Sequence, residues 1–259
     1  MKITYVILIC SATLLCSCSE KKPAAVVAPP EAPKVARAPL ADPFQEATEL
    51  IREERYEEAL QKHIWIHDHV LEERPSYAGV RLSFALAQWA DLGRKYPKAL
   101  VALKEIRDKK TARLLAGENN ASLFQDVKAI NGYLGDTRAT VDLFKQIDSL
   151  QPAFATTVYG QAEGPLVDLE EFILARKYMG DPEIRFAKAK SNYDRGIDFA
   201  AKRASGESSR RAFESIFTDN VVQILLVLDR TGDKVSARNI QTEALAVLDN
   251  SKIRGAIAN

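Results

Sequence analysis

All three histidines of the chain lie in one short segment, His63-Ile-Trp-Ile-His67-Asp68-His69. His63 and His67 are four residues apart, so on a helix they share one face and have a spacing that can chelate Zn, Cu or Ni. His69 is rotated about 200° from His67 around such a helix and cannot join the pair. Because the sequence shows no third ligand, we expect His63 and His67 to be buried or half-buried structural residues. Metal binding by His63 and His67 is the alternative.

Local catalytic signatures are missing from the sequence. It contains no GxSxG, HExxH, GxGxxG or P-loop motif, the patterns that position a nucleophile, a metal or a phosphate. Carboxylates such as Asp168, Glu170 and Glu171 lie in a charge-rich segment, where we expect them to be solvated. We therefore predict no enzymatic activity and no cofactor. The alternative is a cell-wall-directed hydrolase whose carboxylate pair is assembled by the fold.

The composition is that of an ordinary globular protein. The 259 residues include 36 Lys and Arg against 35 Asp and Glu, and 46% of them are hydrophobic. This length suggests one or two domains with a sizeable core. The nearly balanced charge provides no basic field, so nucleic acid is not a predicted partner.

The N-terminus has the features of an export signal. Met1 and Lys2 precede an apolar stretch over residues 3–15. As a helix this stretch spans about 20 Å, less than the hydrocarbon core of about 30 Å. The segment Leu15-Cys16-Ser17-Cys18 follows and resembles the lipobox of bacterial lipoproteins, with Leu three residues before the cysteine and a small residue just before it. The resemblance implies a signal peptide over 1–17 and a lipidated Cys18. Cys16 is the weaker candidate, and an ordinary secretory signal is the alternative.

Cleavage before Cys18 has consequences for the mature chain. It removes the other two cysteines, and the lipid blocks the remaining thiol, so no disulfide is expected. Several acyl chains anchor a protein firmly to a bilayer. The residue after the lipid is Ser19 and not the Asp of an inner-membrane retention signal, so we expect the outer membrane, facing the periplasm. Residues 18–43 hold six of the 11 prolines and predict an extended tether, whose reach is at most roughly 75–80 Å.

Residues 44–250 predict helices and no strands. Apolar residues recur at helical spacing, as in Leu82, Leu86 and Trp89. Glycine and proline turns separate helix-length segments. We expect about ten helices in five antiparallel pairs, over 44–73, 78–116, 121–150, 165–204 and 210–249. Residues 153–163 form a short helix or a joint in this prediction, and 251–259 form a tail.

A spacing of forty residues relates several of these pairs. Tyr56-Glu-Glu-Ala59-Leu60 recurs as Tyr96-Pro-Lys-Ala99-Leu100, and Ala139 lies another forty residues on. With a small residue opening the second helix of each pair, the pattern resembles the tetratricopeptide repeat, although the period is longer and the motif Trp and Gly are absent. The resemblance implies an all-α, right-handed solenoid of about five helical hairpins with a concave binding face.

The same register predicts which side chains line that face. Phe44, Phe84 and Phe124 occupy equivalent positions, and the next two turns carry polar residues. We expect a partner-binding groove formed by Phe84, Gln88, Asp91, Phe124, Lys128 and Asn131. Aromatic side chains would anchor an extended peptide or a helix there. The alternative is that these phenylalanines pack between repeats.

Together these patterns predict a membrane-anchored envelope lipoprotein that acts as a protein-binding adaptor or assembly scaffold. Its partners would be an envelope protein or peptide segment, and the bilayer through Cys18. A metal-binding or metal-responsive lipoprotein that uses His63 and His67 is the alternative, as is the hydrolase.

Overall fold

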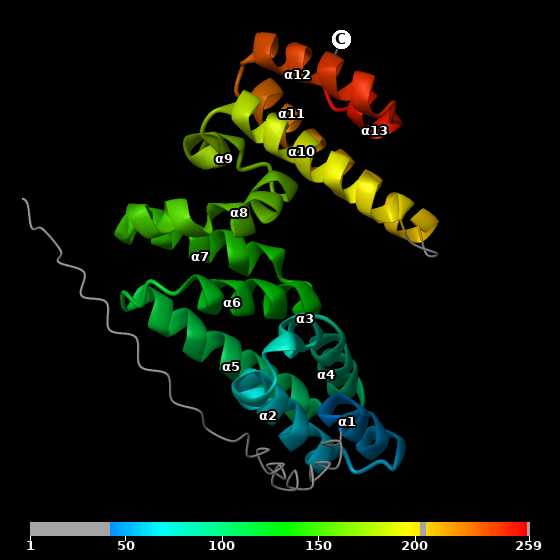
Figure 1. Ribbon diagram of the computed structural model, residues 1–259. Coiled ribbons are helices and arrows are strands. Elements are labelled where there is room, and N and C mark those ends of the chain that lie inside the picture. The colour runs from blue at the N-terminus through cyan, green and yellow to red at the C-terminus, as the bar shows by residue number, and fades with distance from the viewer. Residues whose placement is uncertain (1–41, 203–205, 258–259) are drawn as a thin grey trace, which may run out of the picture. The chain divides into compact units, whose positions relative to one another are not determined.

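The computed structural model describes residues 42–202 and 206–257. The predicted signal peptide, Cys18 and the tether up to residue 41 lie outside these residues. Every regular element in the described ranges is a helix (Figure 1), so the all-α prediction is confirmed. None of these helices is both long and apolar enough to cross a membrane.

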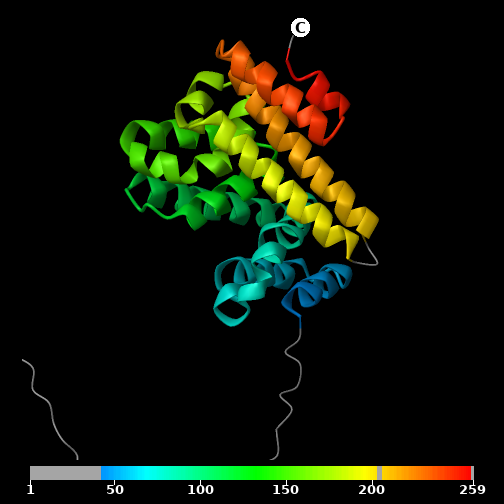
Figure 2. The ribbon, with the colours of Figure 1, turned by 45° about the horizontal axis from the view of Figure 1, so that its top comes forward.

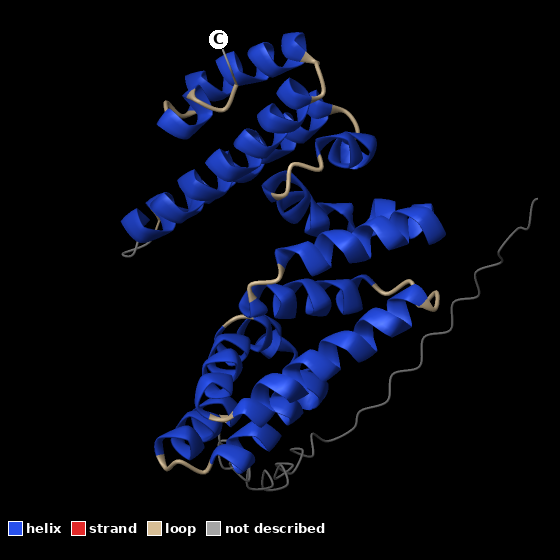
Figure 3. Cartoon of the chain, turned by 180° about the vertical axis from the view of Figure 1, so that it is seen from behind, coloured by secondary structure: helices blue, strands red, loops and turns tan. Residues whose placement is uncertain are grey.

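The helices follow one another through short connections (Figure 3). In chain order they are α1 (Pro43–Arg52), α2 (Tyr56–Glu73), the 3-10 helix η1 (Pro75–Tyr77), α3 (Ala78–Leu82), α4 (Phe84–Lys95), α5 (Pro97–Leu115), α6 (Ala121–Leu134), α7 (Thr137–Leu150), α8 (Pro152–Asp168), α9 (Phe172–Met179), α10 (Pro182–Ala201), α11 (Gly206–Arg230), α12 (Lys234–Val247) and α13 (Ser251–Arg254).

The Gly-Asp pairs found in the sequence act as helix boundaries. Gly135 ends α6 in the left-handed region, at φ 70°, where a residue without Cβ is unstrained. Asp136 then caps α7, because its side chain accepts a hydrogen bond from the Ala139 N–H at 3.1 Å. Between α9 and α10, Gly180 also has a positive φ, of 73°, and the Asp181 side chain caps α10 by accepting from the Glu183 and Ile184 N–H groups. These turns were predictable because they depend only on residues adjacent in the chain.

The first two hairpins stack in the predicted register of forty residues. The ring centroids of Phe44 and Phe84 are 6.5 Å apart, and those of Tyr56 and Tyr96 are 6.2 Å apart. Gln88 Nε2 donates to the Thr48 hydroxyl at 2.9 Å. Residues at equal positions of α1 and α4 are therefore neighbours, as are those opening α2 and α5.

The fourth predicted pair, 165–204, is not formed. The boundary expected at Pro165 lies inside α8, which runs on to Asp168. Pro165 lies in the last turn, where its missing N–H costs the helix one hydrogen bond to the Gln161 carbonyl. The flanking Ala162 and Leu166 are buried in the core. The segment 153–163 is thus part of a continuous helix.

The long helix α10 packs along α11 instead of pairing with α9 (Figure 2). Gly196 lies at a tight contact between the two helices, since a Cβ there would overlap the ring of Phe213. The absence of a side chain lets the aromatic ring of α11 pack against the backbone of α10.

The residues beyond 250, expected as a tail, belong to the folded unit up to residue 257. Ile253 of α13 is buried in the core together with Ile257. Gln241 Nε2 of α12 donates to the Ile253 carbonyl at 2.9 Å. An apolar pair at the end of the chain thus covers the last hairpin.

Candidate functional site

A cavity of about 550 Å³ opens between α1 and α4. Its walls include Thr48, Ile51, Tyr56, Gln88, Asp91 and Lys95, and we call it the α1/α4 groove. Gln88 and Asp91 of the predicted site therefore lie together. The Gln88 amide donates to Thr48, but its Oε1 is buried and has no hydrogen-bond partner. Burying an acceptor without a hydrogen bond costs free energy, and an N–H group of a bound ligand would supply the missing bond.

Phe84 begins α4, the helix that carries Gln88 and Asp91. Its side chain is 67% exposed, and its ring lies beside the half-buried ring of Phe44. An exposed aromatic residue next to a groove is the usual form of a binding anchor. Three of the six predicted groove residues, Phe84, Gln88 and Asp91, are thus available on one helix.

The predicted groove does not continue onto α6. Phe124 is fully buried and packs against Phe144, with ring centroids 6.4 Å apart. Asn131 is also fully buried and donates from Nδ2 to the Thr140 hydroxyl at 3.1 Å. Lys128 is half-buried and does not line the groove.

The prediction was wrong for Phe124 and Asn131 because α6 is packed against α4, α5, α7 and α8. The sequence carried a signal of this. Asp126 and Lys128 are the charged residues among the 14 of α6, whereas the ten residues of α1 include Glu46, Glu49 and Arg52.

The two histidines that share a helix face are both buried, as expected for a structural role. The His63 ring stacks on Trp89 at 5.8 Å, and His67 contacts the same indole edge-on at 6.2 Å. None of their ring nitrogens has a hydrogen-bond partner. Within the described ranges, no group of three His, Cys, Asp or Glu side chains is arranged to hold a metal ion. His69 is exposed on the other side of α2.

Burial makes the two histidines sensitive to acid. Desolvation lowers the pKa of His63 to about 4 and, aided by nearby Lys110, the pKa of His67 to about 3. Because the unfolded chain binds these protons near pH 6.5, stability is retained above that pH and is lost as pH falls toward 4. We expect urea titrations to show a loss of about 1.5 kcal/mol per histidine between pH 6.5 and 5. His63→Leu should flatten this slope and His69→Leu should not; an unchanged slope in His63→Leu would contradict the assignment.

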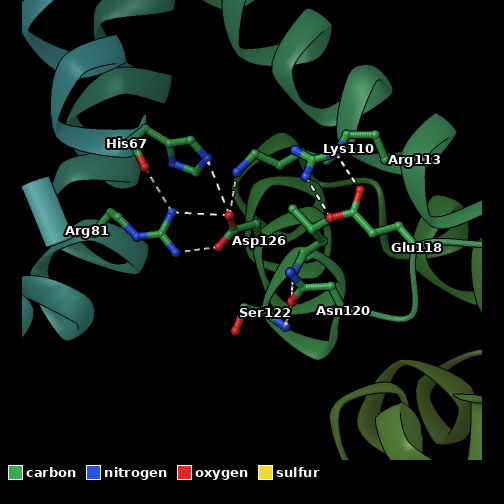
Figure 4. A network of polar contacts seen from close by, with 9 residues as sticks. His67, Arg81, Lys110, Arg113, Glu118, Asn120, Ser122 and Asp126 are labelled. Atoms are coloured by element: carbon green, nitrogen blue, oxygen red, sulfur yellow. Dashed lines mark hydrogen bonds and ion pairs between the residues drawn. The ribbon is translucent and has the colours of Figure 1, made fainter. Parts of the chain in front are cut away.

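A buried charge cluster joins α2, α3, α5 and α6 (Figure 4). Both oxygens of Asp126 accept hydrogen bonds from the Arg81 guanidinium, and Lys110 Nζ also donates to Oδ2. Arg81 Nη1 donates in addition to the His67 carbonyl at 3.1 Å, and His67 Nε2 lies 3.8 Å from Asp126 Oδ2. Burial raises the pKa of Asp126, but the hydrogen bonds from Arg81 and Lys110 outweigh it and hold that pKa below its usual value.

Sequence reasoning did not find this cluster. Arg81 and Asp126 are 45 residues apart, and Lys110 and Asp126 are 16 apart. No local motif relates residues at such separations. A cavity of about 510 Å³ adjoins the cluster and is lined by His67, Arg81, Lys109, Lys110, Arg113 and Asp126, among others. We call it the Asp126 pocket.

Other buried carboxylates in the described part of the chain are also paired with cations. Glu163 binds Arg185 and accepts from the Tyr159 hydroxyl at 2.9 Å, and Asp229 binds Lys234 at 2.6 Å. Asp168 and Glu170 are exposed, as predicted, whereas Glu171 is half-buried and forms an ion pair with Lys145. Acid/base catalysis by two carboxylates needs them to face one substrate, whereas each buried carboxylate here faces a cation.

Comparisons with protein-family models, with curated proteins and with solved structures found no match to this chain. The α1/α4 groove and the Asp126 pocket are therefore interpreted from their own geometry and chemistry.

Proposed function

We propose that this protein is a lipid-anchored adaptor or scaffold of a bacterial envelope, which captures a segment of another envelope protein in the α1/α4 groove. In this proposal Cys18 carries the lipid at the outer membrane, facing the periplasm, and the proline-rich tether sets the reach of the helical unit. Confinement to a membrane raises the effective concentration of a partner without adding any contact. The lipobox-like residues before Cys18 support the anchor.

The scaffold in this proposal is a tetratricopeptide-like, right-handed solenoid. Its clearest units are the first two hairpins, which stack in the register of forty residues. Such stacks present the first helix of each pair on a concave side, where partners bind. The observation that carries the proposal is the exposed Phe84 on α4, one helical turn before the groove residue Gln88.

The groove fits an extended peptide with an apolar side chain. That side chain would cover Phe84 and Phe44, which lie in contact at one end. A backbone N–H of the peptide would donate to Gln88 Oε1, which has no partner. Lys95 and Asp91 on the groove wall provide charges of both signs for the ends of the segment.

The capture is tested by placing a photocrosslinking amino acid at position 84 of the full lipoprotein in cells. We expect one dominant envelope protein to be crosslinked and identified by mass spectrometry. The same probe at position 184 is the matched control, because Ile184 on α10 is 68% exposed, close to the exposure of Phe84. Identical products from both positions would contradict a site in the groove.

Single substitutions should then separate binding from folding. We expect Phe84→Ala and Gln88→Ala to weaken capture about tenfold or more, since anchors of this kind contribute roughly 2 kcal/mol. Ile184→Ala should leave capture unchanged. The measurement is the yield of the crosslinked or co-purified partner, with circular dichroism to confirm that each variant is folded. Undiminished capture by both groove variants would refute this site.

The anchor is tested separately. We expect Cys18→Ala to abolish cleavage at residue 17 and incorporation of labelled palmitate. The variant should leave the outer-membrane fraction, because its acyl chains are missing. Fractionation and intact-mass measurement distinguish the outcomes, with Cys16→Ala as the control. Unchanged mass and partitioning in Cys18→Ala would show that Cys18 is not the anchor.

A further inference from the structure

The Asp126 cluster contains more positive than negative charge. Arg81 and Lys110 both contact the Asp126 carboxylate, and the side chains of all three are largely buried. One carboxylate compensates one of the two cations. Burying a charge without a counter-charge is costly, so a second anion near this cluster would be stabilising.

The Asp126 pocket provides the space for that anion. It lies against the cluster and has a volume of about 510 Å³, within the usual range for small-molecule sites. Lys109 and Arg113 add two more cations to the wall, and Asp68, which is exposed, is the second carboxylate on it. Arg113 forms an ion pair with Glu118, with an N–O distance of 2.6 Å. Lys109 has no ion-pair partner within the described residues. The wall therefore keeps an excess of positive charge.

Two buried polar groups on this wall lack partners. His67 is only 4% exposed, and neither of its ring nitrogens is hydrogen-bonded. The Nε of Arg81 is also buried without a hydrogen bond. Figure 4 shows the His67 ring directed toward Lys110 and Asp126. Unsatisfied groups of this kind are rare in proteins and are usually explained by a ligand, an ion or a water molecule.

We propose that the Asp126 pocket binds the oxyanion group of a small molecule, a carboxylate or a phosphate, between Lys109, Lys110 and His67. Lys110 keeps donors beyond the one that binds Asp126, and ammonium groups bind oxyanions with strong, charge-assisted hydrogen bonds. A neutral His67 supplies one N–H donor. This site lies on α2, α3, α5 and α6, and the proposal does not depend on peptide capture by the α1/α4 groove.

The test is a titration of the purified full-length protein with sodium phosphate, sodium acetate and sodium chloride at equal ionic strength. Trp89 contacts His67 and serves as the fluorescence reporter, in a Trp65→Phe background because the chain has two tryptophans. We expect a saturable change with phosphate, acetate or both, and none with chloride. Phosphate alone identifies a phosphate ligand, and acetate alone identifies a carboxylate. Saturation by neither overturns the proposal.

Variants on α5 provide the specificity control. Lys109→Gln removes an exposed cation of the pocket, and Lys104→Gln removes an exposed cation of the same helix that does not line it. Both change the net charge equally. We expect Lys109→Gln to weaken oxyanion binding about tenfold and Lys104→Gln to leave it unchanged. Equal affinity in the two variants shows general charge screening and overturns the site.

Discussion

Replacing Asp126 by alanine is expected to destabilise the helical unit by about 3–5 kcal/mol, because the substitution leaves two buried cations without their counter-charge. Arg81 and Lys110 are directed at the same carboxylate, and the side chains of all three residues are largely buried. The measurement is the free energy of unfolding from urea titration at pH 7. A loss below about 1 kcal/mol would show that the cluster is hydrated and would contradict its burial.

A triple variant distinguishes the loss of the ion pairs from the loss of the Asp126 side chain itself. Arg81→Met and Lys110→Met, combined with Asp126→Ala, remove all three charges and keep much of the buried volume. Replacing a complete buried ion cluster by apolar groups is often neutral or stabilising. We therefore expect the triple variant to regain most of the stability lost in Asp126→Ala. Asp194→Ala, which breaks the exposed pair of Asp194 with Lys190 on α10, should change the unfolding midpoint little.

Phe124→Ala is expected to cost about 3–5 kcal/mol of stability, the usual range for removing a buried aromatic side chain. Phe124 has no exposed surface and packs against Phe144. Phe84, at the equivalent position of the preceding hairpin, is 67% exposed, so Phe84→Ala should change stability by no more than about 0.5 kcal/mol.

Comparing Phe84→Ala with Phe124→Ala tests whether two equivalent positions, forty residues apart, have different surroundings. Both substitutions remove the same side chain, so their difference reports only the surroundings of the two sites. Urea titration of both variants, with partner capture measured in parallel, assigns Phe84 to binding and Phe124 to the core. Equal stability losses would mean that Phe84 is also a core residue, and the groove would then lose its anchor.

The sequence by itself determined the helical class and those helix boundaries that depend on adjacent residues. Gly135-Asp136 ends one helix and caps the next because both effects act over a few adjacent residues. It also predicted that Phe44 and Phe84 occupy equivalent positions forty residues apart, and the structure places these two rings side by side. The burial of His63 followed from its position on the apolar side of α2.

Only the tertiary structure decided which faces are covered. Phe84 and Phe124 occupy equal positions in the register, but α6 is enclosed by neighbouring helices while the start of α4 is open. The pairing of α10 with α11 depends on the close approach at Gly196, which no local pattern specifies. Arg81, Lys110 and Asp126 come from three helices, and their cluster exists only because packing brings together residues whose separation in the chain carries no periodic signal. Local hydrogen bonding and periodicity depend on residues that are close in the chain, whereas burial and charge pairing depend on how distant helices pack.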